Sequence, residues 1–193
     1  MQPLTRADLL SLEQYARERE VFRARVLAHK KLRTIALGPN MTWIFEDRLS
    51  VQYQVQEMLR TERIFEAEGI AGELNAYNPL IPDGANWKAT MLIEFPDPEV
   101  RQQRLAALKG VEHNCWAGIS GRLRCVAIAD EDLDRSNEEK TSAVHFLRFE
   151  LGAECVAALR AGAALQFGVE HPQYPHVLTV SDESRAALIK DLS

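Results

Sequence analysis

Three histidines are the residues whose types and spacing could do chemistry: His145, His171 and His176. In the strand expected over 142–151, His145 alternates in step with the apolar residues, so its side chain should face the core. A four-residue loop over 172–175 would pair His171 with His176 on the inward face of a hairpin. Paired residues with Cβ atoms about 5 Å apart can share one metal ion.

The three histidines could form one site if the strand over 142–151 lies beside that hairpin. Neutral imidazoles suit Zn or non-haem Fe, with redox or hydrolytic chemistry open. The pattern therefore supports the hypothesis of a metal-dependent enzyme that uses His145, His171 and His176. The alternative is structural, because a histidine on an apolar strand face is often hydrogen-bonded in the core. Strand order decides between the two, and the sequence does not provide it.

An acidic loop precedes the strand over 142–151. Its acids are Asp130, Glu131, Asp132, Asp134, Glu138 and Glu139. The alternating aspartates resemble the start of a calcium loop, but Arg135 stands where glycine is required and Thr141 where glutamate is required, which excludes an EF-hand. We expect either a solvated loop or a docking surface for a protein partner.

Established catalytic motifs are missing from the sequence. It contains no G-x-G-x-x-G, no P-loop, no G-x-S-x-G and no H-E-x-x-H. No base is placed beside a cysteine to make a nucleophile pair. Whether the protein is an enzyme therefore stays open.

Composition excludes several classes of protein. The chain has 193 residues, of which 46% are hydrophobic, enough for a single domain over 1–193 with a large core. A net charge of −5 argues against nucleic-acid binding, which needs a basic face. Three cysteines without C-x-x-C spacing indicate reduced thiols. With no signal peptide and no apolar run long enough to span a membrane, we expect a cytoplasmic protein, and a homo-oligomer is left open.

The elements that must position these residues fall into two parts. The first is predicted to contain a helix over 5–32 with a basic, solvated end that includes Arg33, a hairpin over 35–45, and helices over 48–68 and 71–76. The second is predicted to contain strands over 87–95 and 142–151, helices over 98–110 and 153–161, hairpins over 115–129 and 165–180, and a terminal helix.

The loop over 77–84 contains two prolines and a glycine and is the expected boundary, which would subdivide the chain into 1–78 and 87–193. The fold class is α+β. We predict an antiparallel or mixed sheet built largely from hairpins and flanked by helices, with a helix–hairpin–helix N-terminal part.

Four segments resemble a known family. They are IALGPNMTWIFEDRLSVQYQVQEMLRTERIFEAEGI, AYNPLIPDGANWKATMLIEFPDP, IADEDLDRSNEEKTSAVHFLRFEL and GVEHPQYPH. The chain resembles, over nearly its whole length, an uncharacterised bacterial family, the domain-of-unknown-function family numbered 3501. Members are often encoded beside rubrerythrin-like and heterodisulfide-reductase-like iron–sulfur proteins. The resemblance implies a cytoplasmic accessory protein of a redox or peroxide-response system that docks with such partners, and it marks no catalytic residue.

Overall fold

The computed structural model describes residues 2–120, 123–137 and 139–193, which form two antiparallel sheets and several helices. Sheet A contains, in order, β1 (Thr34–Ala36), β2 (Met41–Phe45), β3 (Asn86–Ile93), β7 (Val144–Glu150) and β6 (Ile128–Ala129). Sheet B contains β5 (Leu123–Val126), β4 (Cys115–Ile119), β8 (Leu165–His171) and β9 (Tyr174–Thr179). The predicted α+β class is confirmed, with two sheets in place of one.

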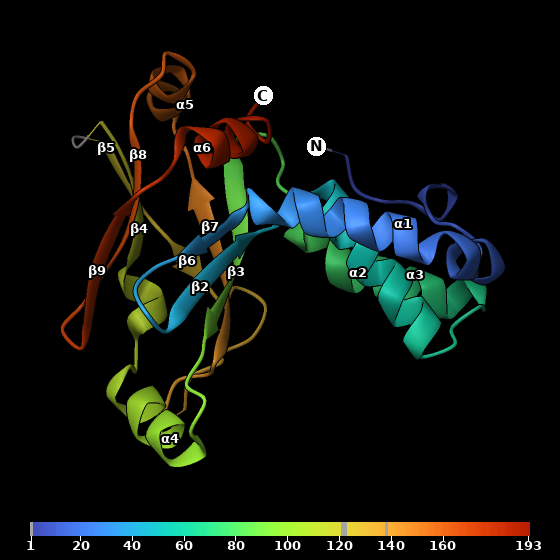
Figure 1. Cartoon of the computed structure of the whole chain (residues 1–193), viewed down its shortest axis with the longest axis horizontal. Coiled ribbons are helices and arrows are strands. Elements are labelled where there is room, and N and C mark those ends of the chain that lie inside the picture. Colours follow the sequence, from blue (N-terminus) through green and yellow to red (C-terminus); the bar gives the residue numbers. More distant parts are fainter. Residues whose placement is uncertain (1, 121–122, 138) are drawn as a thin grey trace.

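The helices divide into an arm and a set at the ends of the sheets (Figure 1). The helical arm consists of α1 (Leu12–Lys31), α2 (Arg48–Thr61) and α3 (Ala67–Tyr77). The body consists of the sheets with α4 (Pro98–Ala107), α5 (Ala153–Arg160) and α6 (Asp182–Ile189). Short turns of 3-10 helix are η1 (Arg6–Asp8), η2 (Asn78–Leu80) and η3 (Val111–Asn114). In the described part of the chain, no helix is both long and apolar enough to cross a membrane.

Aromatic side chains fill the space between the two sheets. Sheet A contributes Trp43, Phe45, Trp87 and Phe149, and sheet B contributes Phe167. Phe45 and Phe167 stack with their ring centroids 4.9 Å apart. Burial of each such ring contributes on the order of 2–3 kcal/mol. The inward face of each strand is therefore the face that this core covers.

A smaller apolar core holds the arm together. It contains Leu4, Val51, Val55, Leu59, Leu74 and Ile81. A polar cluster supports it, because the Tyr15 hydroxyl donates to the Glu57 carboxylate at 2.6 Å and Arg19 donates two bonds of 2.8 Å to the same carboxylate. The arm thus has its own packing, separate from the aromatic core.

Two predicted helices have different boundaries in the structure. The helix expected over 5–32 is interrupted, and α1 begins only after Ser11, whose hydroxyl accepts from Gln14 N. The helix expected over 48–68 ends at Thr61, because Arg63 takes a φ of 55° that no right-handed helix can continue. As a result α3 begins at Ala67 and absorbs the helix expected over 71–76.

A buried arginine joins the arm to the body. Arg33, predicted to lie on a solvated face, is 1% exposed. Its guanidinium donates to the carboxylate of Asp191 and to the backbone oxygens of Phe45, Glu46 and Ala187. Beside it, His29 Nε2 lies 2.5 Å from Asp47 Oδ2. We call His29, Arg33, Asp47 and Asp191 the junction network.

Candidate functional site

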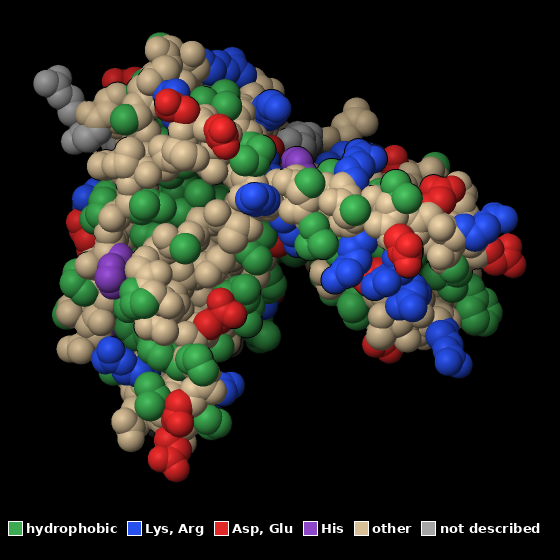
Figure 2. Space-filling view, in the orientation of Figure 1, with side chains coloured by type: hydrophobic (Ala, Val, Ile, Leu, Met, Phe, Trp, Pro, Cys, Tyr) green, Lys and Arg blue, Asp and Glu red, His purple; other side chains and the backbone are tan. Residues whose placement is uncertain are grey.

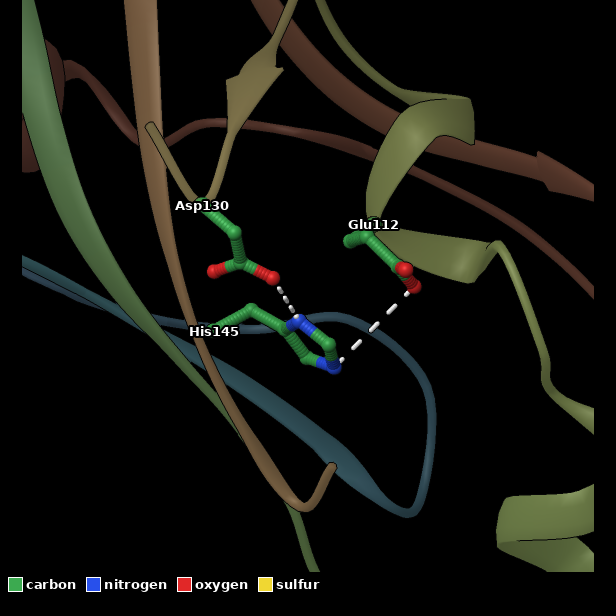
Figure 3. A group of neighbouring side chains, drawn as sticks. All are labelled: Glu112, Asp130 and His145. Atoms are coloured by element: carbon green, nitrogen blue, oxygen red, sulfur yellow. Dashed lines mark hydrogen bonds and ion pairs between the residues drawn. The ribbon is translucent and has the colours of Figure 1, made fainter. Parts of the chain in front are cut away.

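Glu112, Asp130 and His145 converge between the two sheets (Figure 3). They come from η3, from the turn after β6, and from β7. One donor atom of each lies within 4.8 Å of the other two. The imidazole is fully buried, and the carboxylates of Glu112 and Asp130 are 3% and 8% exposed. Two acids and a histidine withdrawn from water form the densest group of metal-ligating side chains that the described residues contain.

The register of β7 aims His145 inward. β7 pairs antiparallel with β3, and Met91 stands opposite His145. His145 alternates in step with Leu147 and Phe149, both of which lie in the aromatic core. The predicted inward orientation of His145 is therefore confirmed.

Asp130 holds the imidazole from one side. Its φ of 50° is in the left-handed region, which aspartate tolerates better than most residues. The turn brings its carboxylate to the backbone N–H of Phe146, at 3.0 Å, and to Nδ1 of His145, at 2.5 Å. Arg135 Nη1 lies 3.4 Å from the same carboxylate. Asp130 thus fixes the orientation of the ring.

Glu112 faces the other side of the imidazole. Gly110, with a φ of 78°, allows the chain to enter η3. The Glu112 carboxylate accepts from Ser136 Oγ at 2.7 Å and from Thr141 Oγ1 at 3.2 Å. Its Oε2 lies 4.0 Å from His145 Nε2, and Thr141 Oγ1 lies 2.9 Å from that nitrogen. Two hydroxyl groups therefore line the space between the carboxylate and the ring.

Hydrogen-bond partners surround the imidazole of His145 on both sides. Nδ1 faces the Asp130 carboxylate, which accepts. Nε2 faces the Ser142 carbonyl oxygen at 3.1 Å and the Thr141 hydroxyl, which donates onward to Glu112. Both ring nitrogens therefore have hydrogen-bond partners. The ring lies between the carboxylates of Asp130 and Glu112.

His171 and His176 do not pair as predicted. The β8–β9 turn has two residues, 172 and 173, so His171 stands opposite Tyr174 and His176 opposite Val169. The expected pairing of His171 with His176 is wrong by two residues. Since side chains alternate with a period of two, this shift keeps both histidines on the same face. The loop expected over 172–175 is shorter because Tyr174 and Pro175 belong to β9, an edge strand, where proline is tolerated.

The strand of His145 also does not lie beside that hairpin. β7 lies between β3 and β6 in sheet A, whereas β8 and β9 belong to sheet B. His171 Nε2 lies 3.2 Å from the Lys109 carbonyl oxygen, and the His176 ring packs on Tyr174 at 4.3 Å between centroids. Among the described residues, the donors gathered around His145 are Glu112 and Asp130, and neither His171 nor His176.

The acidic loop turns several of its charges toward the protein. Glu131 makes two bonds of 2.6 Å to Arg148, and Asp132 bonds Arg135 at 2.6 and 2.8 Å. Asp134 accepts from the backbone N–H of Ser136 at 3.0 Å, and Glu139 is exposed. Glu138 lies outside the described residues. The expectation of a docking surface thus rests on fewer unpaired acids than the sequence suggested.

Sequence reasoning missed Glu112, Ser136 and Thr141. The hydroxyl residues lie in a loop without periodicity, and Glu112 lies in a single helical turn. The available signal was Asp130, the first acid after an expected strand and close in sequence to a strand histidine. Four residues of the candidate site come from one stretch of the chain: Asp130, Ser136, Thr141 and His145.

A cysteine near the site does not contribute a ligand. The Cys115 thiol is fully buried and lies 3.4 Å from the Val111 carbonyl oxygen. Burial, and then the charge of Glu112, raise the pKa of this thiol well above its ordinary value. Cys115 therefore stays protonated, and the site offers nitrogen and oxygen donors only.

Comparison with known proteins places the chain in a family. The model of a family described as protein of unknown function (DUF3501) matches residues 3–192. The chain belongs to this family. A crystal structure of a protein of unknown function from Burkholderia pseudomallei is 47% identical, covers 100% of both chains and has a TM-score of 0.94. No curated protein matches the chain. Family membership thus supports the fold over its full length and brings no activity with it.

Proposed function

We propose that this protein binds one divalent transition-metal ion between His145 Nε2 and Glu112. The observation that carries the proposal is the 4.0 Å separation of these two donors. Two metal–ligand bonds of about 2.1 Å span such a separation. The 2.5 Å between Asp130 Oδ2 and Nδ1 is too short to hold an ion. Asp130 instead orients the ring, as carboxylates do for metal-bound histidines.

Thr141 supplies a further oxygen at this position. Its Oγ1 lies 2.9 Å from His145 Nε2 and 3.2 Å from Glu112 Oε2. Adjacent ligands around an ion with bonds of about 2.1 Å are separated by about 3 Å, so the hydroxyl fits without a large movement. A bound ion would replace the proton on Nε2 and balance the two carboxylates. Imidazole with oxygen donors suits Zn²⁺ or Fe²⁺.

The donor set favours a site with open positions on the ion. Imidazole and carboxylate are its two strong ligands, and the Thr141 hydroxyl is a weak one. Remaining positions would be taken by water or by a substrate oxygen, which is the arrangement that metal-assisted hydrolysis or oxygen chemistry requires. The half-buried Ser136 marks the loop side as the route from solvent.

The test is the metal content of untagged protein. Stripped protein is dialysed against Zn²⁺, or against Fe²⁺ without oxygen, and the bound ion is counted per chain. We expect one ion, and about a tenfold to hundredfold weaker affinity in Glu112→Gln and in Asp130→Asn. Glu99→Gln, which changes an exposed acid on α4, should bind as the wild type does.

Two results would overturn this assignment. If folded protein takes up no ion, the proposed metal site is wrong. Unchanged affinity in Glu112→Gln, with binding lost in a His171→Ala, His176→Ala variant, would move the ion to the other histidines. Unfolding curves of each metal-free variant separate loss of the ligand from loss of the fold.

An accessory role is the second proposal. It follows from the family resemblance: a cytoplasmic protein of a redox or peroxide-response system that docks with iron–sulfur or rubrerythrin-like partners. The observation that favours it is Leu133, which is 64% exposed at the tip of the acidic loop, between Asp132 and Asp134. Co-purification of such a partner should be lost in Leu133→Ser and retained in Leu27→Ser, which changes an exposed leucine on α1. If the partner co-purifies equally with both variants, the acidic loop is not part of the interface.

A further inference from the structure

A pocket lies in the notch between the helical arm and the outward face of sheet A (Figure 2). Its volume is about 520 Å³. A neighbouring hollow of about 310 Å³ shares Tyr77, Leu80 and Phe146 with it. Small-molecule sites have volumes of about 300–1,000 Å³, so the pocket is large enough for one. It is separate from the candidate metal site, because Phe146 and His145 point to opposite faces of β7.

The walls of the pocket are mainly apolar. Tyr77, Pro79 and Leu80 line it from the end of the arm, and Phe146 lines it from β7. The Arg135 guanidinium stacks on Phe146, 4.5 Å from the ring centroid, and so holds the ring in place. Two aromatic faces and a leucine can cover the apolar part of a ligand.

Two cations lie next to each other on the floor. Lys88 on β3 stands directly opposite Arg148 on β7, and both line the pocket. Like charges directly opposite each other in an antiparallel pair are destabilising. Arg148 is neutralised, because its guanidinium bonds the carboxylates of Glu131 and Glu150. The floor therefore contains Arg148, which is paired with two carboxylates, and Lys88 directly opposite it.

Lys88 makes no direct ion pair with a described residue, although its charge adds to the hydrogen bond from Arg148 in lowering the pKa of Glu131. Its ammonium donates to the Pro79 carbonyl oxygen at 2.6 Å, and no described carboxylate lies within ion-pair distance of it. An ammonium has three donors, so donors remain for another acceptor. The acids on the rim are already engaged, Glu131 by Arg148 and Asp132 by Arg135. Arg148, Lys88, Glu131 and Glu150 together carry no net charge, and the Lys88 ammonium still has hydrogen-bond donors for an acceptor in the pocket.

We infer that this pocket binds a small organic acid with an apolar body. The anionic group pairs with Lys88, and the apolar body lies between Tyr77 and Phe146. The inference does not depend on a metal ion, since the pocket shares none of the proposed ligands. Protein stripped of metal, and the Glu112→Gln variant, should bind the acid as the wild type does.

Two fluorescent probes of nearly the same shape test the charge. 8-Anilinonaphthalene-1-sulfonate is an aromatic acid, and N-phenyl-1-naphthylamine is the same framework without the sulfonate. We expect one bound sulfonate per chain, with affinity about tenfold weaker in Lys88→Met. The uncharged probe should bind both proteins equally. Lys31→Met, on the exposed surface of α1, is the matched control and should change neither affinity.

A second pair of variants locates the probe. Ala76 lines the pocket, whereas Ala71 lies on the same helix outside it. Ala76→Trp fills the pocket and should weaken both probes at least tenfold, and Ala71→Trp should weaken neither. Equal sulfonate affinity in Lys88→Met and Lys31→Met would overturn the inference, as would no binding or binding that Ala76→Trp leaves unchanged. Unfolding curves must first show that each variant is folded, since partly folded chains also bind these dyes.

Discussion

Two His–Asp pairs in the described part of the chain have the same 2.5 Å separation and different surroundings. In the junction network, His29 pairs with Asp47, and the buried Arg33 guanidinium lies against both Asp47 and Asp191. At the candidate site, His145 pairs with Asp130, but the far side of the imidazole faces another carboxylate, Glu112. Each aspartate has an arginine within ion-pair distance, Arg33 beside Asp47 and Arg135 beside Asp130. The feature that distinguishes the second pair is the Glu112 carboxylate on the far side of the ring.

This difference separates a structural network from a candidate site. Arg33 donates hydrogen bonds to Asp191 and to backbone oxygens of the body, so the junction network joins the arm to the body. Among the described residues, Glu112 accepts from the hydroxyls of Ser136 and Thr141, and its carboxylate lies 4.0 Å from the ring nitrogen. A His–Asp pair therefore does not mark a site unless a second anionic donor faces the other ring nitrogen.

The largest effect should come from removing the cation of the junction network. Arg33→Met leaves Asp191 buried without its partner and leaves Asp47 paired with His29, and breaking a buried pair in this way costs about 3–5 kcal/mol. Urea unfolding measures the loss. Arg25→Met, on the exposed face of α1, should stay within about 0.5 kcal/mol of the wild type. If the two variants unfolded alike, Arg33 would not be what holds the arm to the body.

Arg33 also shows where prediction from the sequence stops. Alternation of apolar and polar residues correctly predicted the inward direction of His145 and most of the strands, because this signal is local. The hairpin expected over 115–129 is an exception, since its second strand divides into β5 in sheet B and β6 in sheet A. Arg33 was expected to be solvated, since its sequence neighbours are basic and its partner Asp191 is 158 residues away. A charged side chain is buried only when a distant counter-ion meets it, and no local pattern contains that information.

In the candidate site, too, the local features could be predicted from the sequence and the distant partners could not. The face of His145 could be read from alternation, but its partners depend on how sheets A and B pack and on an aperiodic loop. The β8–β9 register shows the limit again, because the face of His176 was correct and its partner was not. Alternation of apolar and polar residues specifies which face of the sheet a side chain is on. It does not distinguish between two strand registers that differ by two residues.

A smaller effect should appear as a pH dependence of the junction network. Burial raises the pKa of Asp191 to about 6, although Arg33 opposes the shift. A raised pKa stabilises the fold below the ordinary pKa of the acid, and this contribution is lost as pH rises through about 6. The wild type should therefore lose about 1–3 kcal/mol relative to Asp191→Asn between pH 4 and pH 7.

Unfolding free energies of both proteins at four pH values across this window give the comparison. Asparagine keeps an acceptor oxygen for Arg33, so the variant should fold. Other acids titrate in both proteins, and only the difference between the two curves reports Asp191. Parallel curves would mean that the Arg33–Asp191 pair stays charged throughout and that burial does not control it.

The smallest effect on stability is expected at Glu112, the residue that distinguishes the candidate site from the junction network. Glu112→Gln removes a buried charge but keeps hydrogen-bonding groups for Ser136 and Thr141, whose hydroxyls can rotate to suit an amide. Asp130 remains as the partner of Nδ1 of His145 at 2.5 Å. In metal-free protein the free energy of unfolding should therefore change by less than about 1 kcal/mol, whereas Asp130→Asn should lose several times as much. A loss above about 2 kcal/mol in Glu112→Gln would make Glu112 a necessary counter-ion, and the site would then be structural in the same sense as the junction network.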